Sequence, residues 1–291
     1  MTAAGAQPCC LEGHRRYDVL LLVKRGKLKA TKWWEITLPS AMYRRCIGVD
    51  VVLPAIVAVA AASGSSCTST DSTGSAGSGS GSAAAAPHVV QVATVHLEST
   101  SSGAKYRAKQ LDLLATELGK GKAPGTTTVL CGDMNMCASC DEENSRIEAN
   151  YDDCWPIVVG KRNASTKPKA RLKEAAAVAR WHADQGFTED TSVNKMRFQM
   201  NLEHAQVRID RILIQKASAA AAKQFAIGGA AAAAAGSGGG WRPETIQLLG
   251  TRELCTTTPR LGGGFQKSTK KELSVFPSDH FGLVAALRYS R

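Results

Sequence analysis

The chain has 291 residues and a formal net charge of +11 at pH 7. This length can bury a large core, and a single α/β domain of this size is ordinary. The excess of Lys and Arg predicts an anionic partner, for which nucleic acid and an acidic membrane surface are both candidates. Nine cysteines without regular spacing indicate a reducing compartment and argue against a disulfide framework.

Targeting and metal-binding patterns are weak. Residues 1–10 lack the basic segment and long apolar run of a secretory signal, so we do not expect a secreted protein. The longest apolar stretch, residues 51–62, contains Pro54 and is too short to span a bilayer. Cys137 and Cys140 have the spacing of a zinc-binding pair, but no second pair accompanies them, so we expect no zinc site.

Hydrophobic periodicity predicts the following elements. The strands are expected, in chain order, at residues 17–24, 33–38, 46–53, 89–95, 127–131, 207–214, 245–249 and 281–287. An amphipathic helix is expected over residues 103–118, and an Ala-rich helix over residues 171–183. The basic residues 24–32 predict an exposed hairpin tip between the first two strands.

Two segments interrupt this pattern. Residues 63–86 consist almost entirely of Ser, Gly, Ala and Thr, and residues 217–240 are rich in Ala and Gly. Such compositions bury too little apolar surface to order themselves, so both are predicted to be disordered insertions in one domain over residues 13–291. The many strands with helices between them predict an α/β sandwich of two sheets covered by helices.

The stretch from Thr127 to Asn135 contains the strongest candidate for a site. A short apolar run ends at Gly132, and Asp133 and Asn135 follow two residues apart. In extended backbone, residues i and i+2 point to the same side, so these two side chains are expected to face one point. This arrangement suits a hard cation or a water that attacks phosphorus, whereas the alternative is an Asx-turn after a strand.

Two further stretches have the same pattern, because each places an acid or an imidazole at the end of an extended run. His96 is followed by Leu-Glu-Ser-Thr, and Asp279 and His280 stand in the string Phe-Pro-Ser-Asp-His-Phe-Gly-Leu. A Ser hydrolase is not indicated at Ser278, because no G-x-S-x-G turn accompanies it.

The ordered strings HLES, GDMN, RIDRI and FPSDHFGL resemble the endonuclease/exonuclease/phosphatase superfamily of DNase I-like phosphodiesterases. They are most similar to its tyrosyl-DNA phosphodiesterase 2 branch. The resemblance implies an α/β fold, a DNase I-like four-layer sandwich of two mixed β-sheets flanked by helices, with the site between the sheets. It also implies Mg²⁺ or Mn²⁺ as the cofactor.

The resemblance implies a role for each matching residue. Asp133 would orient and deprotonate the attacking water, and Asn135 would fix its position. His96 would donate a hydrogen bond to a non-bridging phosphate oxygen, and His280 would contact the phosphate. Asp279 would support the site, either as a metal ligand or as the partner of an imidazole.

Residues around these motifs are expected to play supporting roles. Ser99, beside Glu98, is a candidate for substrate binding. Arg208, Asp210 and Arg211 are expected to form a salt-bridged strand end near the site. For Arg208 a structural role and a contact with substrate both stay open.

The chain also departs from the family's pattern. The family carries an Asn and a metal-binding Glu on strands before the first motif, and this chain matches neither. It has no Asn before Asn135, and of its two glutamates before His96, Glu12 and Glu35, the second matches a later, non-catalytic strand. We therefore expect its first strands to be missing. Cys137 stands where the branch has an Arg, and the string Phe187–Asp190 replaces one that contains a Trp. Both differences weaken the assignment of a substrate.

The sequence thus predicts a metal-dependent phosphodiesterase that acts on DNA, at 5′ ends carrying tyrosine or a protein. We expect a monomer without membrane association, located in the nucleus or in nucleus and cytoplasm. One alternative is another DNase I-like phosphodiesterase with an RNA or phospholipid substrate. The other is a catalytically inactive fragment that binds nucleic acid.

Overall fold

The computed structural model describes eight segments of the chain: residues 19–24, 28–53, 88–120, 126–136, 140–159, 185–216, 240–257 and 273–290. The predicted insertion at residues 63–86, the predicted helix at 171–183 and Cys137 lie outside the described residues, as does the second predicted insertion except for Gly240. Within the described segments, no helix has the length and apolar character to cross a membrane.

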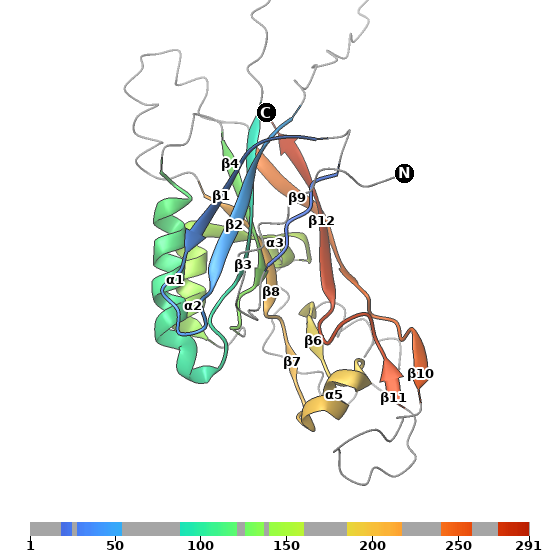
Figure 1. The fold of residues 1–291 in the computed structure, drawn as a ribbon. Coiled ribbons are helices and arrows are strands. Elements are labelled where there is room, and N and C mark those ends of the chain that lie inside the picture. The colour runs from blue at the N-terminus through green and yellow to red at the C-terminus, as the bar shows by residue number, and fades with distance from the viewer. Residues whose placement is uncertain are drawn as a thin grey trace, which may run out of the picture.

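A six-stranded mixed sheet forms the centre of the fold (Figure 1). Its strands, in spatial order, are β1 (Lys29–Thr37), β2 (Arg45–Val52), β3 (Val89–His96), β4 (Thr127–Asp133), β8 (Asp210–Gln215) and β5 (Tyr151–Asp153). β3 and β4 are parallel, and the other neighbours are antiparallel. Because β3 and β4 run in the same direction, both end at the same edge of the sheet.

The predicted strands of this sheet are confirmed with different bounds. The strand predicted at residues 207–214 begins at Asp210 in this sheet, because Val207 pairs with Glu189 in another sheet and residues 208–209 are not strand. Residues 19–24 are not a strand, so the prediction at 17–24 was wrong for these residues. Lys29 and Lys32 lie inside β1 and not in a hairpin tip. The reason is that pairing with β2 extends back to Lys29, opposite Val52, while the lysines stay exposed on an edge strand, where charge is tolerated.

Two helices cover one face of the sheet (Figure 1). They are α1 (Ala104–Glu117) and α2 (Asp141–Asn150), with the one-turn helix η1 (Ser101–Gly103) before α1. As predicted, Leu111 and Leu114 of α1 and the following Leu118 are buried in the core against this face of the sheet. α2 was not predicted, because its sequence is mostly polar; Ile147 and the buried ion pair of Glu143 with Arg107 attach it to α1.

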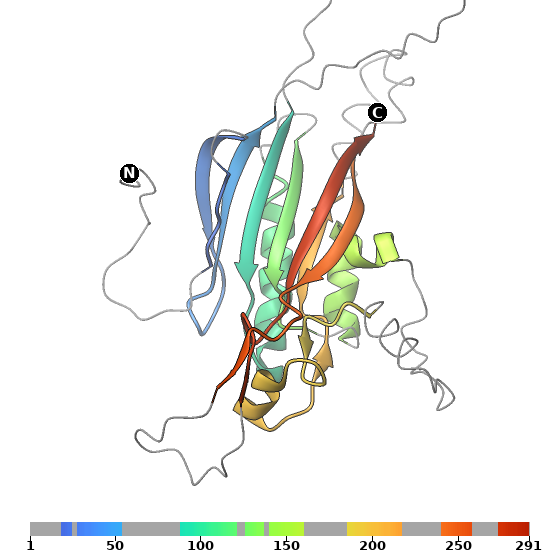
Figure 2. The same cartoon turned by 90° about the vertical axis from the view of Figure 1, so that its right-hand side faces the viewer.

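A second, antiparallel sheet of β9 (Gly240–Leu249) and β12 (Gly282–Ser290) lies beside the other face (Figures 1 and 2). α3 (Cys154–Val159) packs against β8 and β9. The remaining elements are β6 (Glu189–Asp190), α5 (Lys195–Asn201), β7 (Gln206–Val207), β10 (Cys255–Thr257) and β11 (Leu273–Val275). The described residues therefore form three layers: helices, the mixed six-stranded sheet and the second sheet. These are three of the four predicted layers.

Candidate active site

Three polar side chains lie in one row across the end of the six-stranded sheet. His96 on β3 is opposite Asp133 on β4, and Asp133 is opposite Asp210 on β8. Residues directly opposite one another in a ladder project from the same face of the sheet. The register of the three strands therefore brings an imidazole and two carboxylates together.

Gly132 allows this row to form. Its φ is +136°, and a Cβ at this position would lie 1.9 Å from the carbonyl oxygen of Val95 on the neighbouring strand. A glycine is the residue that tolerates both this backbone conformation and such a close approach. The glycine of the GDMN string therefore has a structural function, which is to bring β4 against β3 directly before Asp133.

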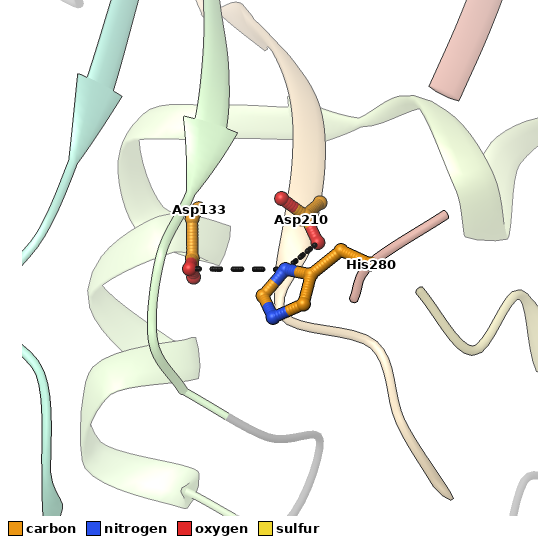
Figure 3. Close-up of side chains that lie close together, drawn as sticks. All are labelled: Asp133, Asp210 and His280. Atoms are coloured by element: carbon orange, nitrogen blue, oxygen red, sulfur yellow. Dashed lines mark hydrogen bonds and ion pairs between the residues drawn. The ribbon is translucent and has the colours of Figure 1, made fainter. Parts of the chain in front are cut away.

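His280 reaches the row from the second sheet, on the loop before β12. Its Nδ1 atom lies 3.1 Å from Oδ2 of Asp210 and 4.0 Å from Oδ2 of Asp133 (Figure 3). Asp210, and not the adjacent Asp279, is therefore the hydrogen-bond partner of the His280 imidazole. Asp279 is exposed, and its carboxylate accepts a hydrogen bond from the Ser278 hydroxyl. A role of Asp279 as a metal ligand stays a prediction.

The electrostatics of the row favour proton transfer near neutral pH. Burial and the charge of Asp210 raise the pKa of Asp133 to about 6, against the opposing hydrogen bond from the Asn135 backbone. Burial would lower the pKa of His280, but the hydrogen bond and charge of Asp210 outweigh it and raise this pKa to about 9. At pH 7 Asp133 is thus a carboxylate able to accept a proton, and His280 is an imidazolium.

The pKa of His96 is shifted in the opposite direction to that of His280. Burial, followed by the charges of Arg44 and His280, lowers its pKa to about 4, so its ring is neutral at pH 7. Its Nε2 atom lies 3.5 Å from Oδ2 of Asp133, which is a contact between a neutral imidazole and a carboxylate and not an ion pair. A neutral imidazole can donate a hydrogen bond from the nitrogen that carries its proton.

Asn135 lies beside Asp133, but not for the predicted reason. β4 ends at Asp133, and Asn135 has a left-handed backbone with φ 50°. Its backbone N–H donates to Oδ1 of Asp133 at 2.7 Å, so the Asx-turn that we considered as the alternative is present. Its side-chain amide donates to the carbonyl of Leu97, which ties the turn to the end of β3.

Ser99 belongs to a network around the loop between β1 and β2. Its hydroxyl accepts a hydrogen bond from the buried Arg44 guanidinium at 2.7 Å. Ser40 donates to the carboxylate of Glu98, and the Ser40 hydroxyl accepts from the Arg44 backbone. Arg44 was not among the predicted residues, although its charge lowers the pKa of both His96 and Asp133. No pattern in the sequence distinguishes it from Arg45.

The RIDRI string separates into two different interactions. Arg208 lies 2.7 Å and Arg211 3.6 Å from Oδ2 of Asp153, so these arginines pair with β5. Asp210, between them, pairs with His280. The predicted salt-bridged strand end exists, but the prediction that Asp210 belongs to it was wrong. Asp210 and Arg211 are adjacent in β8, so their side chains project from opposite faces, and this alternation could have indicated that Asp210 has a role separate from Arg211.

The site has donor atoms for a divalent cation. Asp133, Asp210 and His280 form the one group of potential metal ligands found in the described segments, with one atom from each within 4.8 Å of the others. Mg²⁺ is commonly held by one or two carboxylates, with water and substrate phosphate completing its shell. The two carboxylates fit that donor set, whereas the imidazole is already hydrogen-bonded to Asp210.

The fold is that of known DNase I-like proteins. TDP2 of D. rerio complexed with a single-strand DNA product matches 90% of this chain over 69% of its own length, with a TM-score of 0.50 and 16% sequence identity. TDP2 of C. elegans matches 91% of this chain over 52% of its own length, with a TM-score of 0.50 and 17% identity. No family model and no curated protein sequence matches this chain.

These likenesses define the class of fold. The chain has the α/β sandwich fold of the endonuclease/exonuclease/phosphatase superfamily, as the motifs predicted. Within that superfamily, the structures it is similar to include those of TDP2, the tyrosyl-DNA phosphodiesterase 2.

Proposed function

We propose that this chain is a metal-dependent phosphodiesterase that acts on DNA, at 5′ ends carrying a tyrosine or protein adduct. The observation that carries the proposal is the row of His96, Asp133 and Asp210, which His280 meets from the second sheet. Figure 3 shows Asp133 and Asp210 of this row with His280. The row combines a carboxylate that accepts protons near pH 6, a neutral imidazole and an imidazolium. These groups supply a general base for the attacking water and a hydrogen-bond donor and a positive charge for the developing negative charge.

Each residue has a defined task in the proposed reaction. Asp133 orients a water and accepts its proton as the water attacks phosphorus. His96, as a neutral imidazole, donates a hydrogen bond to a non-bridging oxygen, while the positive charge of His280 stabilises the negative charge that develops there. Asp210 keeps His280 protonated and oriented. Asn135 fixes the carboxylate of Asp133 through its backbone N–H.

A cation would be held by the carboxylates of Asp133 and Asp210, with Asp279 as a further predicted ligand. Mg²⁺ or Mn²⁺ bound there would polarise the phosphate and orient it for attack. The choice between these ions belongs to the proposal, as does a nuclear location of the protein.

Two observations support DNA as the substrate. The net charge of +11 predicts a polyanionic partner. The D. rerio TDP2 structure of the same fold contains a single-strand DNA product. The 5′-tyrosine specificity rests on the resemblance of the four sequence motifs, and a monomeric state is proposed with it.

The test is cleavage of a short DNA that carries a 5′-phosphotyrosine, with Mg²⁺ or Mn²⁺, by the wild-type chain and by Asp133→Asn. Removing the general base is expected to lower kcat by about 10²-fold to 10⁴-fold. Asp50→Asn is the matched control, because Asp50 is also a strand carboxylate but accepts its hydrogen bond from Trp34, away from the row. This control is expected to retain activity.

Other outcomes identify the alternatives. Cleavage of RNA or of a phospholipid, without cleavage of the tyrosyl DNA, would support the proposed phosphodiesterase reaction and reject the proposed DNA substrate. A folded wild-type chain that cleaves nothing at any metal concentration, but binds DNA with a steep dependence on salt, would be an inactive nucleic-acid-binding protein.

A further inference from the structure

The contact between Asp210 and His280 joins two parts of the molecule that share no strand ladder. Asp210 begins β8 of the six-stranded sheet, and His280 precedes β12 of the two-stranded sheet. Strand register therefore fixes Asp210 relative to Asp133, but it does not fix His280 relative to Asp210. Some other interaction has to set this distance.

Thr188 contacts the backbone on both sides of that pair. Its side chain is fully buried, and its hydroxyl accepts the backbone N–H groups of Ile209 at 3.1 Å and Asp210 at 3.0 Å. Its carbonyl oxygen accepts the backbone N–H of Phe281, the residue after His280, at 2.7 Å. A single residue thus holds the backbone of Asp210 with its side chain and the backbone next to His280 with its main chain.

Asn194 provides a second anchor for the loop that carries His280. It is fully buried, and its side-chain amide donates to the carbonyl oxygens of Ser278 at 2.8 Å and Asp279 at 3.2 Å. Its side-chain oxygen accepts the backbone N–H of Arg197 and caps the start of α5. The loop is therefore held just before His280 by Asn194 and just after it by Thr188.

We propose that Thr188 is a positioning residue that sets the distance between Asp210 and His280, with Asn194 as the second anchor of the same loop. The effect of Thr188 on the reaction rate rests on the function proposed above, whereas its effect on the position of His280 does not. The site depends on such an anchor because a displacement of about 1 Å at a reacting group costs about 100-fold in rate.

The substitution Thr188→Val tests the hydroxyl at nearly constant volume. It leaves the N–H groups of Ile209 and Asp210 without their acceptor, while the backbone bond to Phe281 remains. Thr188→Ser restores the hydroxyl and is the conservative rescue. Thr191→Val is the matched control, because the Thr191 hydroxyl is also buried but makes its two hydrogen bonds with Ala205, outside the site.

Two measurements follow each variant: the NMR signal of the imidazole N–H of His280 in the hydrogen bond to Asp210, and kcat and KM separately. Thr188→Val is expected to shift or broaden the His280 signal and to lower kcat by about 10-fold to 100-fold with little change in KM. Thr188→Ser is expected to restore both measurements. Thr191→Val is expected to change neither, even if it lowers stability.

A wild-type His280 signal and a wild-type kcat in Thr188→Val would overturn the proposal. Equal changes in Thr188→Val and Thr191→Val would also overturn it, because the effect would then come from general loss of packing. If Thr188→Val does not fold, Asn194→Ser replaces it, since serine keeps an acceptor for the cap of α5, buries no charge and removes the amide that donates the two bonds to the loop. If the wild-type protein is inactive, the NMR signal still tests the positioning of His280, and the function alone is rejected.

Discussion

The two sides of the site are built in different ways. On the side of the six-stranded sheet, the register of β3, β4 and β8 places three side chains in one row. On the other side, His280 sits on a loop that Thr188 and Asn194 hold by hydrogen bonds. The first side is fixed by repeated backbone pairing, whereas a few single contacts fix the second. The comparison teaches that damage to the sheet should unfold the protein, and damage to the loop should mainly misplace one imidazole.

The largest effect is expected from Gly132→Ala in the six-stranded sheet. The new Cβ would meet the Val95 carbonyl at 1.9 Å, and alanine strains a backbone at φ +136°, so β3 and β4 have to separate. We expect a loss of more than about 4 kcal/mol in the free energy of unfolding, measured by urea denaturation.

The matched control lies after β9 of the two-stranded sheet. Gly250 also has a positive φ of +73°, but a Cβ there would meet Pro277 at an ordinary 3.5 Å. Gly250→Ala is expected to cost about 1 kcal/mol, the cost of the backbone conformation alone. Equal losses in the two variants would contradict the different construction of the two sides.

The next effect is a dependence of stability on pH that comes from the loop side. Because the pKa of His280 is raised to about 9 in the folded state, its stabilisation is complete below pH 6.5 and is lost as the pH rises through 9. The full difference is about 3 kcal/mol. Urea denaturation between pH 6.5 and 7.5 should show the first part of the decline, before the cysteine thiols titrate in the unfolded chain.

Two variants identify which carboxylate causes this dependence of stability on pH. Asp210→Asn removes the hydrogen-bonded carboxylate and is expected to flatten it. Asp279→Asn removes the exposed carboxylate next to the imidazole and is expected to leave most of it. The reverse result would make Asp279 the partner of the imidazole, which is one of the two roles that the sequence left open.

The smallest effect is expected from Arg208→Met, next to the six-stranded sheet, where Arg208 pairs with Asp153 of β5. The Arg208 guanidinium is held by Asp153 at 2.7 Å, and Arg211 remains near the same carboxylate. We expect a loss of about 2 kcal/mol in stability and no more than about a 2-fold change in KM for DNA. An increase of KM by about 10-fold at unchanged stability would instead show that Arg208 contacts substrate.

The active pH range gives a further way to test the two sides together. Asp133, on the sheet, has to be deprotonated, and its pKa is about 6. His280, on the loop, has to be protonated, and its pKa is about 9. The proposed function therefore predicts a bell-shaped dependence of kcat/KM on pH, with an acidic limb from Asp133 and a basic limb from His280. Asp210→Asn is expected to move the upper limb to lower pH, which a pH profile of tyrosyl-DNA cleavage measures.

The sequence by itself determined the strands that carry His96 and Asp133 and the helix of Leu111 and Leu114. Each of these elements has a strong local pattern, either a buried apolar run or an apolar stripe at helical spacing. Such a pattern can be recognised without knowledge of the tertiary contacts. The motif order also predicted the fold and named most of the residues near the site. It failed where the pattern was polar, as in α2, which forms because a buried ion pair and Ile147 attach it to α1.

Only the tertiary structure decided the partners within the site. The sequence gives no register between strands far apart in the chain, so it could not place Asp210 opposite Asp133 or bring His280 to Asp210. It also predicted an extended backbone through Asn135. The chain turns there instead, because a side-chain oxygen of Asp133 accepts a hydrogen bond from the Asn135 N–H. Local sequence thus sets which groups stand at the ends of strands. The pairing of strands and the hydrogen bonds of Thr188 and Asn194 decide which of those groups meet.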